Sequence, residues 1–425
     1  MKRTLFILSS IVLIITVLKA KAQVKYDKYF TDSQLRIDYY LYGNSDCVSY
    51  ALDKLVMEPQ WGGPRVQLID EMKYGAYYFE VTLPDSDIVL YSHGYCLLFG
   101  EWQTSEEALK ISKGFHESVV MPFPNETVDV IFYARNEYGD FVEKMKITVD
   151  PDDYFIKPAP QLPYAIYDVY GNYPVENAVD IVLLPDGYTM QEMGKFVQDC
   201  HFFVESLFKY EPFNRYKDRF NVRAVMVPSQ ESDITMPADG FYRNTALSCS
   251  FWTFNSERYC MTYDNETMKT LAGQVPYDQI YILANTEKYG GGGIFNSYCV
   301  STTGNRYSSD VIIHEFGHGF AGLADEYAYD GSDNYSLDIE PWEPNITTMK
   351  NFEAKWKDML SNKTPVPTPA EKKYDKTVGV YEGAGYQLKG IYRPMIDCLM
   401  NSFDGDKFCP VCDRAIERMI KYYSE

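Results

Sequence analysis

The first part of the chain alternates hydrophobic and polar positions in short runs that end at turn-forming residues. Residues 35–42 and 75–83 follow this pattern, and the runs 128–134 and 141–149 flank the turn sequence Asn-Glu-Tyr-Gly. An alternation with a period of two is typical of strands that have one buried face. Several such strands in succession predict an N-terminal β-sandwich domain over residues 23–150.

The pattern changes after residues 151–164, a stretch that holds four prolines and is expected to be a linker. The uninterrupted hydrophobic run 179–184 predicts a buried strand, and residues 190–210 have hydrophobic positions at helical spacing. Further strands are expected later in this part of the chain. Strands interleaved with helices predict an α/β domain over residues 165–425, so the fold class is multidomain α+β. The further strands are expected at 220–227, 278–284 and, as an edge strand after a flexible turn of four glycines at 290–293, at 296–302.

The first 22 residues predict a signal peptide. They have a basic start, a short hydrophobic run and the small-residue pattern Ala20-Lys21-Ala22, which favours cleavage after Ala22. The hydrophobic run is shorter than a usual membrane span. We therefore expect a secreted, periplasmic or cell-surface protein with no stable membrane insertion after cleavage.

Charge and cysteine content narrow the class of partner. The net charge is −20, and it becomes −24 without the four basic residues of the signal peptide. A protein this acidic repels phosphate backbones, so nucleic acid is not an expected partner. Nine cysteines in an exported chain permit disulfides, and Cys249 and Cys260 are close enough in sequence to form one. Cys398, Cys409 and Cys412 form a second group, for which a structural role is expected.

The strongest chemical signal lies in residues 309–327, which contain the pattern His-Glu-x-x-His. On a helix, His314 and His318 are four residues apart and lie on one face, so both can bind the same metal ion. Glu315 lies beside them and can accept a proton from a water molecule at the metal. The pattern predicts the metal site of a hydrolase.

Residues that follow the second histidine extend this pattern. Gly322 comes where the helix is expected to end, and Asp325 follows three residues later. The layout H-E-x-x-H-x-x-x-G-x-x-D resembles that of the metzincin metallopeptidases, H-E-x-x-H-x-x-G-x-x-H. The sequence Gly-Leu-Ala-Asp-Glu-Tyr from Gly322 to Tyr327 resembles more closely the bacterial IgA-peptidase family. This chain has one additional residue before the glycine, and aspartate replaces the third histidine.

The resemblance implies one catalytic Zn²⁺ ion bound by His314, His318 and Asp325, with Glu315 as the catalytic residue. Glu326, the next residue, is the alternative third ligand. Aspartate oxygen is an acceptable zinc ligand.

A methionine-containing turn downstream is part of the same resemblance. Within residues 393–402, Met400 matches the Met-turn of metzincins, a structural turn whose methionine packs beneath the metal without binding it. Met395 is the alternative. An amphipathic helix is expected at 412–423. The resemblance covers residues 165–425 and implies a metzincin-like catalytic domain.

The combined reading is a secreted zinc-dependent endopeptidase that hydrolyses peptide bonds of extracellular proteins. Its expected partner is a protein or peptide substrate, and Arg393, Tyr327 and Tyr298 are candidates for stabilising the oxyanion. One alternative is a zinc amidase that acts on cell-wall or glycopeptide substrates. Another is a non-catalytic surface protein that binds glycans or proteins, although a purely structural metal site has no need of Glu315. No residue indicates immunoglobulin specificity.

A second metal is suggested more weakly by an acidic loop. Residues 330–338 include three aspartates, which are typical Ca²⁺ ligands. Their spacing is not that of an EF-hand, so a solvated loop is the alternative.

Overall fold

The computed structural model describes residues 24–329, 335–403 and 407–425. The predicted signal peptide lies outside the described residues, as does most of the aspartate-rich part of the acidic loop. Among the described residues, none of the helices combines the length and the hydrophobicity that crossing a membrane requires.

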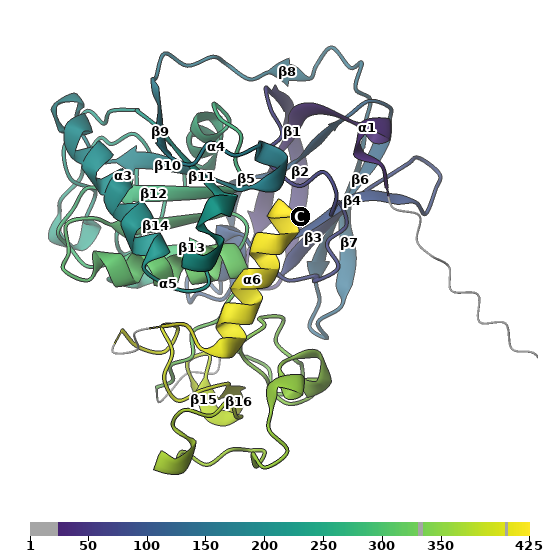
Figure 1. Cartoon of the computed structure of the whole chain (residues 1–425). Coiled ribbons are helices and arrows are strands. Elements are labelled where there is room, and N and C mark those ends of the chain that lie inside the picture. Colours follow the sequence, from purple (N-terminus) through teal and green to yellow (C-terminus); the bar gives the residue numbers. More distant parts are fainter. Residues whose placement is uncertain (1–23, 330–334, 404–406) are drawn as a thin grey trace, which may run out of the picture.

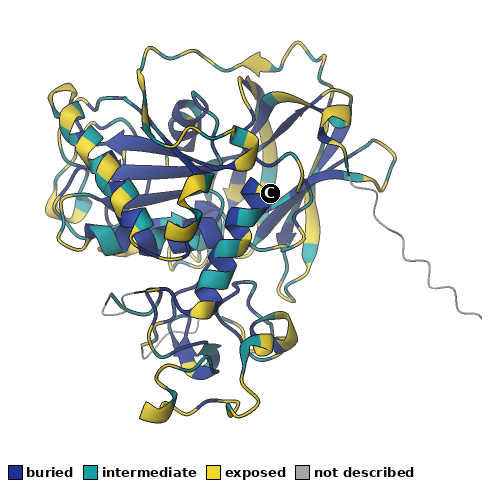
Figure 2. Ribbon diagram, in the orientation of Figure 1, coloured by how far each residue is buried: buried dark blue, intermediate teal, exposed yellow. Residues whose placement is uncertain are grey.

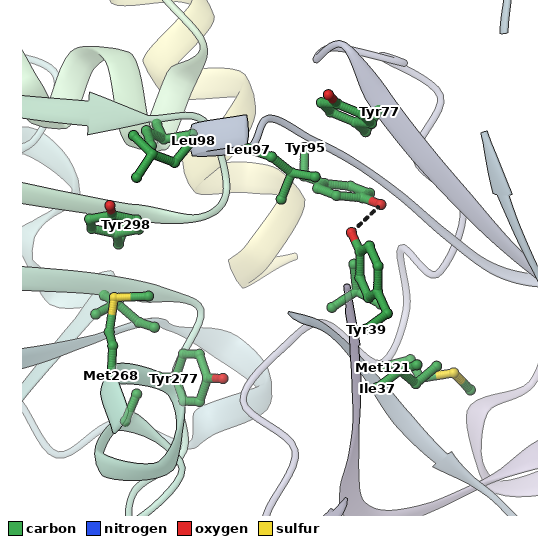
Figure 3. Packing of buried hydrophobic residues seen from close by; sticks show 14 of the residues in the cluster. Ile37, Tyr39, Tyr77, Tyr95, Leu97, Leu98, Met121, Met268, Tyr277 and Tyr298 are labelled. Carbon is green, nitrogen blue, oxygen red and sulfur yellow. Dashed lines mark hydrogen bonds between the residues drawn. The ribbon is translucent and has the colours of Figure 1, made fainter. Parts of the chain in front are cut away.

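The N-terminal part contains two four-stranded sheets that face each other (Figure 1). The ring of Tyr39 lies 5.2 Å from that of Phe132 on the opposite sheet. Its hydroxyl lies 3.1 Å from that of Tyr95, also on the opposite sheet (Figure 3). This arrangement fits the β-sandwich that the alternating pattern predicts. The first sheet has the order β5 (Lys113–Pro124), β1 (Phe30–Gly43), β2 (Val48–Glu58), β8 (Lys157–Pro158), and the second has the order β4 (Val89–Tyr95), β3 (Tyr77–Thr82), β6 (Val128–Arg135), β7 (Phe141–Val149); two short helices, α1 (Tyr26–Tyr29) and α2 (Leu98–Gln103), accompany them.

The polar face of β1 is also buried. Arg36 donates from Nη1 to Glu58 at 2.9 Å and from Nε to Asp38 at 2.9 Å, and all three side chains are buried. Lys269 of helix α4 (Asn265–Ala272), from the second half of the chain, lies close by, and burial lowers its pKa to about 8. The charged face of the sandwich is therefore an internal interface with the rest of the protein.

A six-stranded sheet forms the centre of the second half (Figure 1). Its hydrophobic central strand β10 (Val179–Asp186) is buried throughout, with parallel neighbours on both sides, as the uninterrupted run 179–184 predicts. The sheet order is β13 (Gly291–Ile294), β14 (Tyr298–Thr302), β12 (Gln279–Ala284), β10, β11 (Phe220–Val225), β9 (Ile166–Tyr170), with the two edge strands antiparallel.

Three helices share one hydrophobic cluster with this sheet. They are α3 (Met193–Phe208), α5 (Ser308–Ala321) and the C-terminal α6 (Pro410–Ser424). In Figure 2, α3 carries exposed positions on its outer surface, whereas α5 is buried or half-buried along its whole length. Together the two halves confirm a multidomain α+β fold with several sheets.

The described residues between α5 and α6 form one hairpin and three short 3₁₀ helices. The strands of the hairpin, β15 (Tyr381–Ala384) and β16 (Gln387–Arg393), lie below α6 in Figure 1. Short 3₁₀ helices occur throughout the second half: η1 (Val175–Asn177), η2 (Met190–Glu192), η3 (Asn214–Arg219), η4 (Pro237–Asp239), η5 (Thr253–Asn255), η6 (Phe352–Ala354), η7 (Lys357–Met359) and η8 (Lys372–Tyr374).

The prediction of a flexible turn at the four glycines was wrong. Residues 291–294 form β13, which pairs with β14 and is the edge of the sheet, so β14 is internal. A Cβ atom at Gly293 would lie 2.3 Å from the carbonyl oxygen of Glu315. The glycines are needed because they let a strand approach the backbone of α5, a use of glycine that sequence alone does not distinguish from flexibility.

Candidate metal centre

Helix α5 positions both histidines and ends at the expected glycine. Gly322 has φ 61°, and its N–H donates to the carbonyl of His318 at 3.0 Å. A Cβ atom at this position would lie 2.8 Å from the ring of Trp342. A left-handed glycine that ends the helix turns the chain back toward the two histidines.

Three donor atoms converge after this turn. Nε2 of His314 lies 3.1 Å from Nε2 of His318 and 3.0 Å from Oδ1 of Asp325. The distance from Nε2 of His318 to Oδ1 of Asp325 is 3.4 Å. We call these three residues the histidine centre. The structure thus brings together all three residues that the sequence nominates as metal ligands.

The hydrogen bonds behind the rings fix which nitrogens face the centre. Nδ1 of His314 lies 3.0 Å from the carbonyl oxygen of Leu399, and Nδ1 of His318 lies 2.6 Å from that of Leu323. A carbonyl only accepts, so each Nδ1 carries a hydrogen, and in the neutral form each ring directs the Nε2 lone pair inward. Within the described part of the chain, Oδ1 of Asp325 is buried without a hydrogen-bond partner. Two lone pairs and a carboxylate oxygen at these distances fit a bound divalent cation.

The pKa shifts at the histidine centre also indicate that the site favours positive charge. Burial lowers the pKa of His318, but the nearby charge of Asp325 outweighs it and raises the value to about 9. Burial would raise the pKa of Asp325, yet the two histidines hold it well below its usual range. The carboxylate is therefore ionised and attracts whichever cation, proton or metal, occupies the site.

Asp325 is held in place by the tip of the β15–β16 hairpin. The N–H of Gly385 donates to the carbonyl of Asp325 at 2.9 Å, and the N–H of Tyr386 donates to that of Tyr327 at 3.0 Å. The Tyr386 hydroxyl donates to Oδ2 of Asp325. Tyr386 has φ 68°, which is rare for a bulky residue and indicates a constrained turn. Sequence reasoning missed Tyr386; the only signal is the glycine-rich turn before it.

Glu326, the alternative third ligand, faces away from the histidines. Its Oε1 accepts a hydrogen bond from Asn345 at 3.0 Å and lies 3.1 Å from Sγ of Cys412. The side chain is fully buried. Asp325 and Glu326 are adjacent in sequence, but their side chains have different partners.

Met400 lies in a tight turn next to α5. The N–H of Asn401 donates to the carbonyl of Cys398 at 2.8 Å, and the Met400 carbonyl accepts from the N–H of Glu326 at 2.7 Å. The buried sulfur of Met400 lies 2.9 Å from the position of a Cβ at Gly317, on α5 between the two histidines. Met395, the alternative, is buried elsewhere in the same cluster.

Glu315 lies under the edge strand β13. Its Cγ lies 3.2 Å from the position of a Cβ at Gly291. Burial raises the pKa of Glu315, and the charges of the two histidines oppose the rise. A half-buried carboxyl with a raised pKa beside a cation site is suited to accept and return a proton.

The three oxyanion candidates differ in their availability. The Tyr298 hydroxyl is buried and donates to the carbonyl of Thr262 at 2.7 Å. Arg393 donates to the carbonyls of Met395 and Gly383. Tyr327 is 36% exposed and follows the histidine centre directly in sequence. Tyr327 is therefore the most exposed of the three residues.

Two family models match the chain, one in each half. The family model described as IgA Peptidase M64 matches residues 169–377 and 370–420. The model described as Peptidase M64 N-terminus matches residues 25–146. No curated protein matches the chain significantly. The peptidase model alone spans more than half of the sequence, so the chain belongs to the IgA peptidase M64 family, as the resemblance implied.

Proposed function

We propose that this protein is an exported zinc-dependent endopeptidase that hydrolyses peptide bonds of extracellular proteins. The carrying observation is the convergence of two histidine ring nitrogens and the Asp325 carboxylate beside the half-buried Glu315. Membership of a peptidase family supports the reaction class. Two histidines and one carboxylate are a ligand set of catalytic zinc sites, which keep one position open.

A zinc ion at the histidine centre would supply the acidity that activates water and the positive charge that polarises the substrate carbonyl. Other residues of the chain hold the proposed ligands in position. The carbonyls of Leu399 and Leu323 orient the histidine rings, and Tyr386 orients Asp325. Such supporting hydrogen bonds fix ligand geometry before substrate binds.

Glu315 is the proposed general base. It accepts a proton from the attacking water and delivers it to the leaving amine, so one carboxyl serves both halves of the hydrolysis. Its raised pKa brings it closer to neutral pH, where both transfers are easier. Tyr327 is the proposed donor to the carbonyl oxygen as negative charge develops there.

The test is a map of cleavage sites on a panel of extracellular proteins. The wild-type protein and the Glu315→Gln variant are compared by mass spectrometry of new N-termini. Glu205→Gln, at an exposed position of α3, is the matched control and should retain full activity. Wild-type cleavages that disappear only in Glu315→Gln support the proposal. A wild-type map indistinguishable from that of Glu315→Gln would overturn it.

Two additions separate the alternatives. Cell-wall peptides and glycopeptides in the same assay test for a zinc amidase, which would use the same donor set. N-terminal sequencing of the mature protein tests cleavage after Ala22.

The zinc content of the variant is a further control. Zinc measured in the Glu315→Gln protein should equal that in wild type, because Glu315 is not a proposed ligand.

A further inference from the structure

A second group of metal-binding side chains lies on the other side of the segment that carries Asp325. Glu326, Cys398, Cys409 and Cys412 each offer one donor atom, and these atoms all lie within 4.8 Å of one another. None of the four is more than 2% exposed. We call this group the cysteine centre. It shares no residue with the histidine centre.

The spacing within the cysteine centre suits a single tetrahedral ion. Sγ of Cys398 lies 3.8 Å from Sγ of Cys412. Zinc–sulfur bonds of about 2.3 Å at a tetrahedral angle separate two sulfurs by about 3.8 Å. Oε1 of Glu326 completes the group at 3.1 Å from Sγ of Cys412.

The backbone around the sulfurs favours thiolates. The N–H of Cys409 donates to Sγ of Cys398 at 3.3 Å, and the N–H of Cys412 donates to Sγ of Cys409 at 3.5 Å. Cys409 occupies the N-cap of α6, so its sulfur lies at the positive end of a 15-residue helix. Both features stabilise negative charge on sulfur.

Glu326 provides an independent indication of a missing cation. Its Oε2 is fully buried and has no hydrogen-bond partner among the residues that the structure describes. A disulfide between any two of the cysteines would leave this carboxylate without a partner of opposite charge. Burying an unpaired carboxylate is costly, whereas one divalent cation would pair with all four groups.

We propose that Glu326, Cys398, Cys409 and Cys412 bind a second, structural zinc ion. Binding displaces the thiol protons to solvent and involves no change of oxidation state. All four positions are filled by the protein, so no water can be activated there. The ion would fasten the start of α6 to the turn that carries Met400, and through Glu326 to the segment that carries Asp325.

Metal content is the first measurement. Wild-type protein purified without chelator should hold about two zinc ions per chain, one for each four-coordinate site. His318→Ala should lose the ion of the histidine centre and retain the other. The converse variant, Cys398→Ser with Cys412→Ser, should retain only the first. Cys200→Ser is the matched control, because Cys200 is equally buried in α3 but outside the cysteine centre.

Cobalt substitution identifies the ligands directly and does not depend on activity. Cobalt bound tetrahedrally by thiolates absorbs strongly in the visible and near-ultraviolet. That absorption should appear in wild type and in His318→Ala and be absent from the double cysteine variant. If the double cysteine variant does not fold, the spectra of wild type and His318→Ala still show whether thiolates bind the cobalt ion.

Three results would overturn the proposal. The first is a wild-type protein with one zinc ion per chain that is lost in His318→Ala. The others are a cobalt spectrum without thiolate absorption and a protein mass that shows a disulfide among the three cysteines. Each of these readouts is independent of peptide hydrolysis. An inactive protein with a thiolate–cobalt spectrum would therefore contradict the proposed peptidase and leave the second zinc site standing.

Discussion

The histidine centre and the cysteine centre meet at adjacent residues but differ in exposure. In the histidine centre, the side chains of His314 and His318 are 11% and 17% exposed. In the cysteine centre, three of the four residues are completely buried. Glu315 accompanies the first centre, and the second has no comparable base among its residues. An accessible site with a base suits catalysis, and a closed site with four protein ligands suits structure.

The backbone links the two centres although their side chains do not mix. Asp325 contacts the two histidines, whereas the adjacent Glu326 contacts Asn345 and Cys412. The turn at 398–401 supplies a sulfur to the cysteine centre, and its Leu399 carbonyl supports His314. A side-chain change should therefore affect one centre, whereas a backbone change should affect both. The predictions below test this separation.

The largest expected effect is on catalysis at the histidine centre alone. Glu315→Gln keeps the size of the side chain and removes the base. General acid–base catalysis contributes about 10²- to 10⁴-fold, so kcat/KM should fall by that factor. Urea unfolding and the thiolate–cobalt spectrum should not change. A loss of stability or of thiolate–cobalt absorption in this variant would show that the two centres are not separable.

The second-largest expected effect is on stability and concerns Met400, which lies between the centres. Its buried side chain packs against Gly317 of α5. Met400→Ala leaves a cavity and should lower the free energy of unfolding by about 2–5 kcal/mol, while Met400→Leu, of similar volume, should cost less than about 1.5 kcal/mol. Urea titration of both variants checks this. Equal losses in the two would mean that the sulfur, and not its volume, is what matters.

The sequence was informative where spacing along one helix determines proximity. His314, Glu315 and His318 are related by helical geometry, and the end of α5 at Gly322 follows from the conformations open to glycine. The alternating runs likewise predicted both N-terminal sheets. These predictions need only local rules.

Contacts between distant segments could not be read in the same way. The hydroxyl of Tyr386 reaches Asp325 across 61 residues, and the hairpin sequence does not specify what its tip touches. Cys412 contacts Glu326 across 86 residues of sequence. The sequence therefore grouped the three cysteines but did not indicate that Glu326 joins them. The glycines of β13 were misread because close packing and flexibility both favour glycine.

A smaller effect, on metal affinity, is expected when the hydrogen bond that supports Asp325 is removed. Tyr386→Phe removes one hydroxyl and keeps the ring. Loss of such a supporting hydrogen bond should weaken zinc binding at the histidine centre about 10- to 100-fold. Competition with a chelator measures this, and the cysteine centre should keep its ion. Tyr329→Phe is the control, since its ring lies 5.9 Å from that of Tyr386 but the residue is 53% exposed. Equal weakening in both variants would contradict the assigned role.

The smallest expected effect tests the backbone link itself. Gly322→Ala forces a side chain into left-handed conformation, at a cost of about 1–2 kcal/mol, and brings its Cβ against Trp342. Because Asp325 and Glu326 follow this turn, metal affinity should fall at both centres together, as measured by chelator competition and the cobalt spectrum. Gly194→Ala in α3 is the control, because a Cβ there meets no atom within 4 Å. If Gly322→Ala weakens only the histidine centre, the cysteine centre is held by Cys398 and α6 independently of this turn, and the link through Glu326 is wrong.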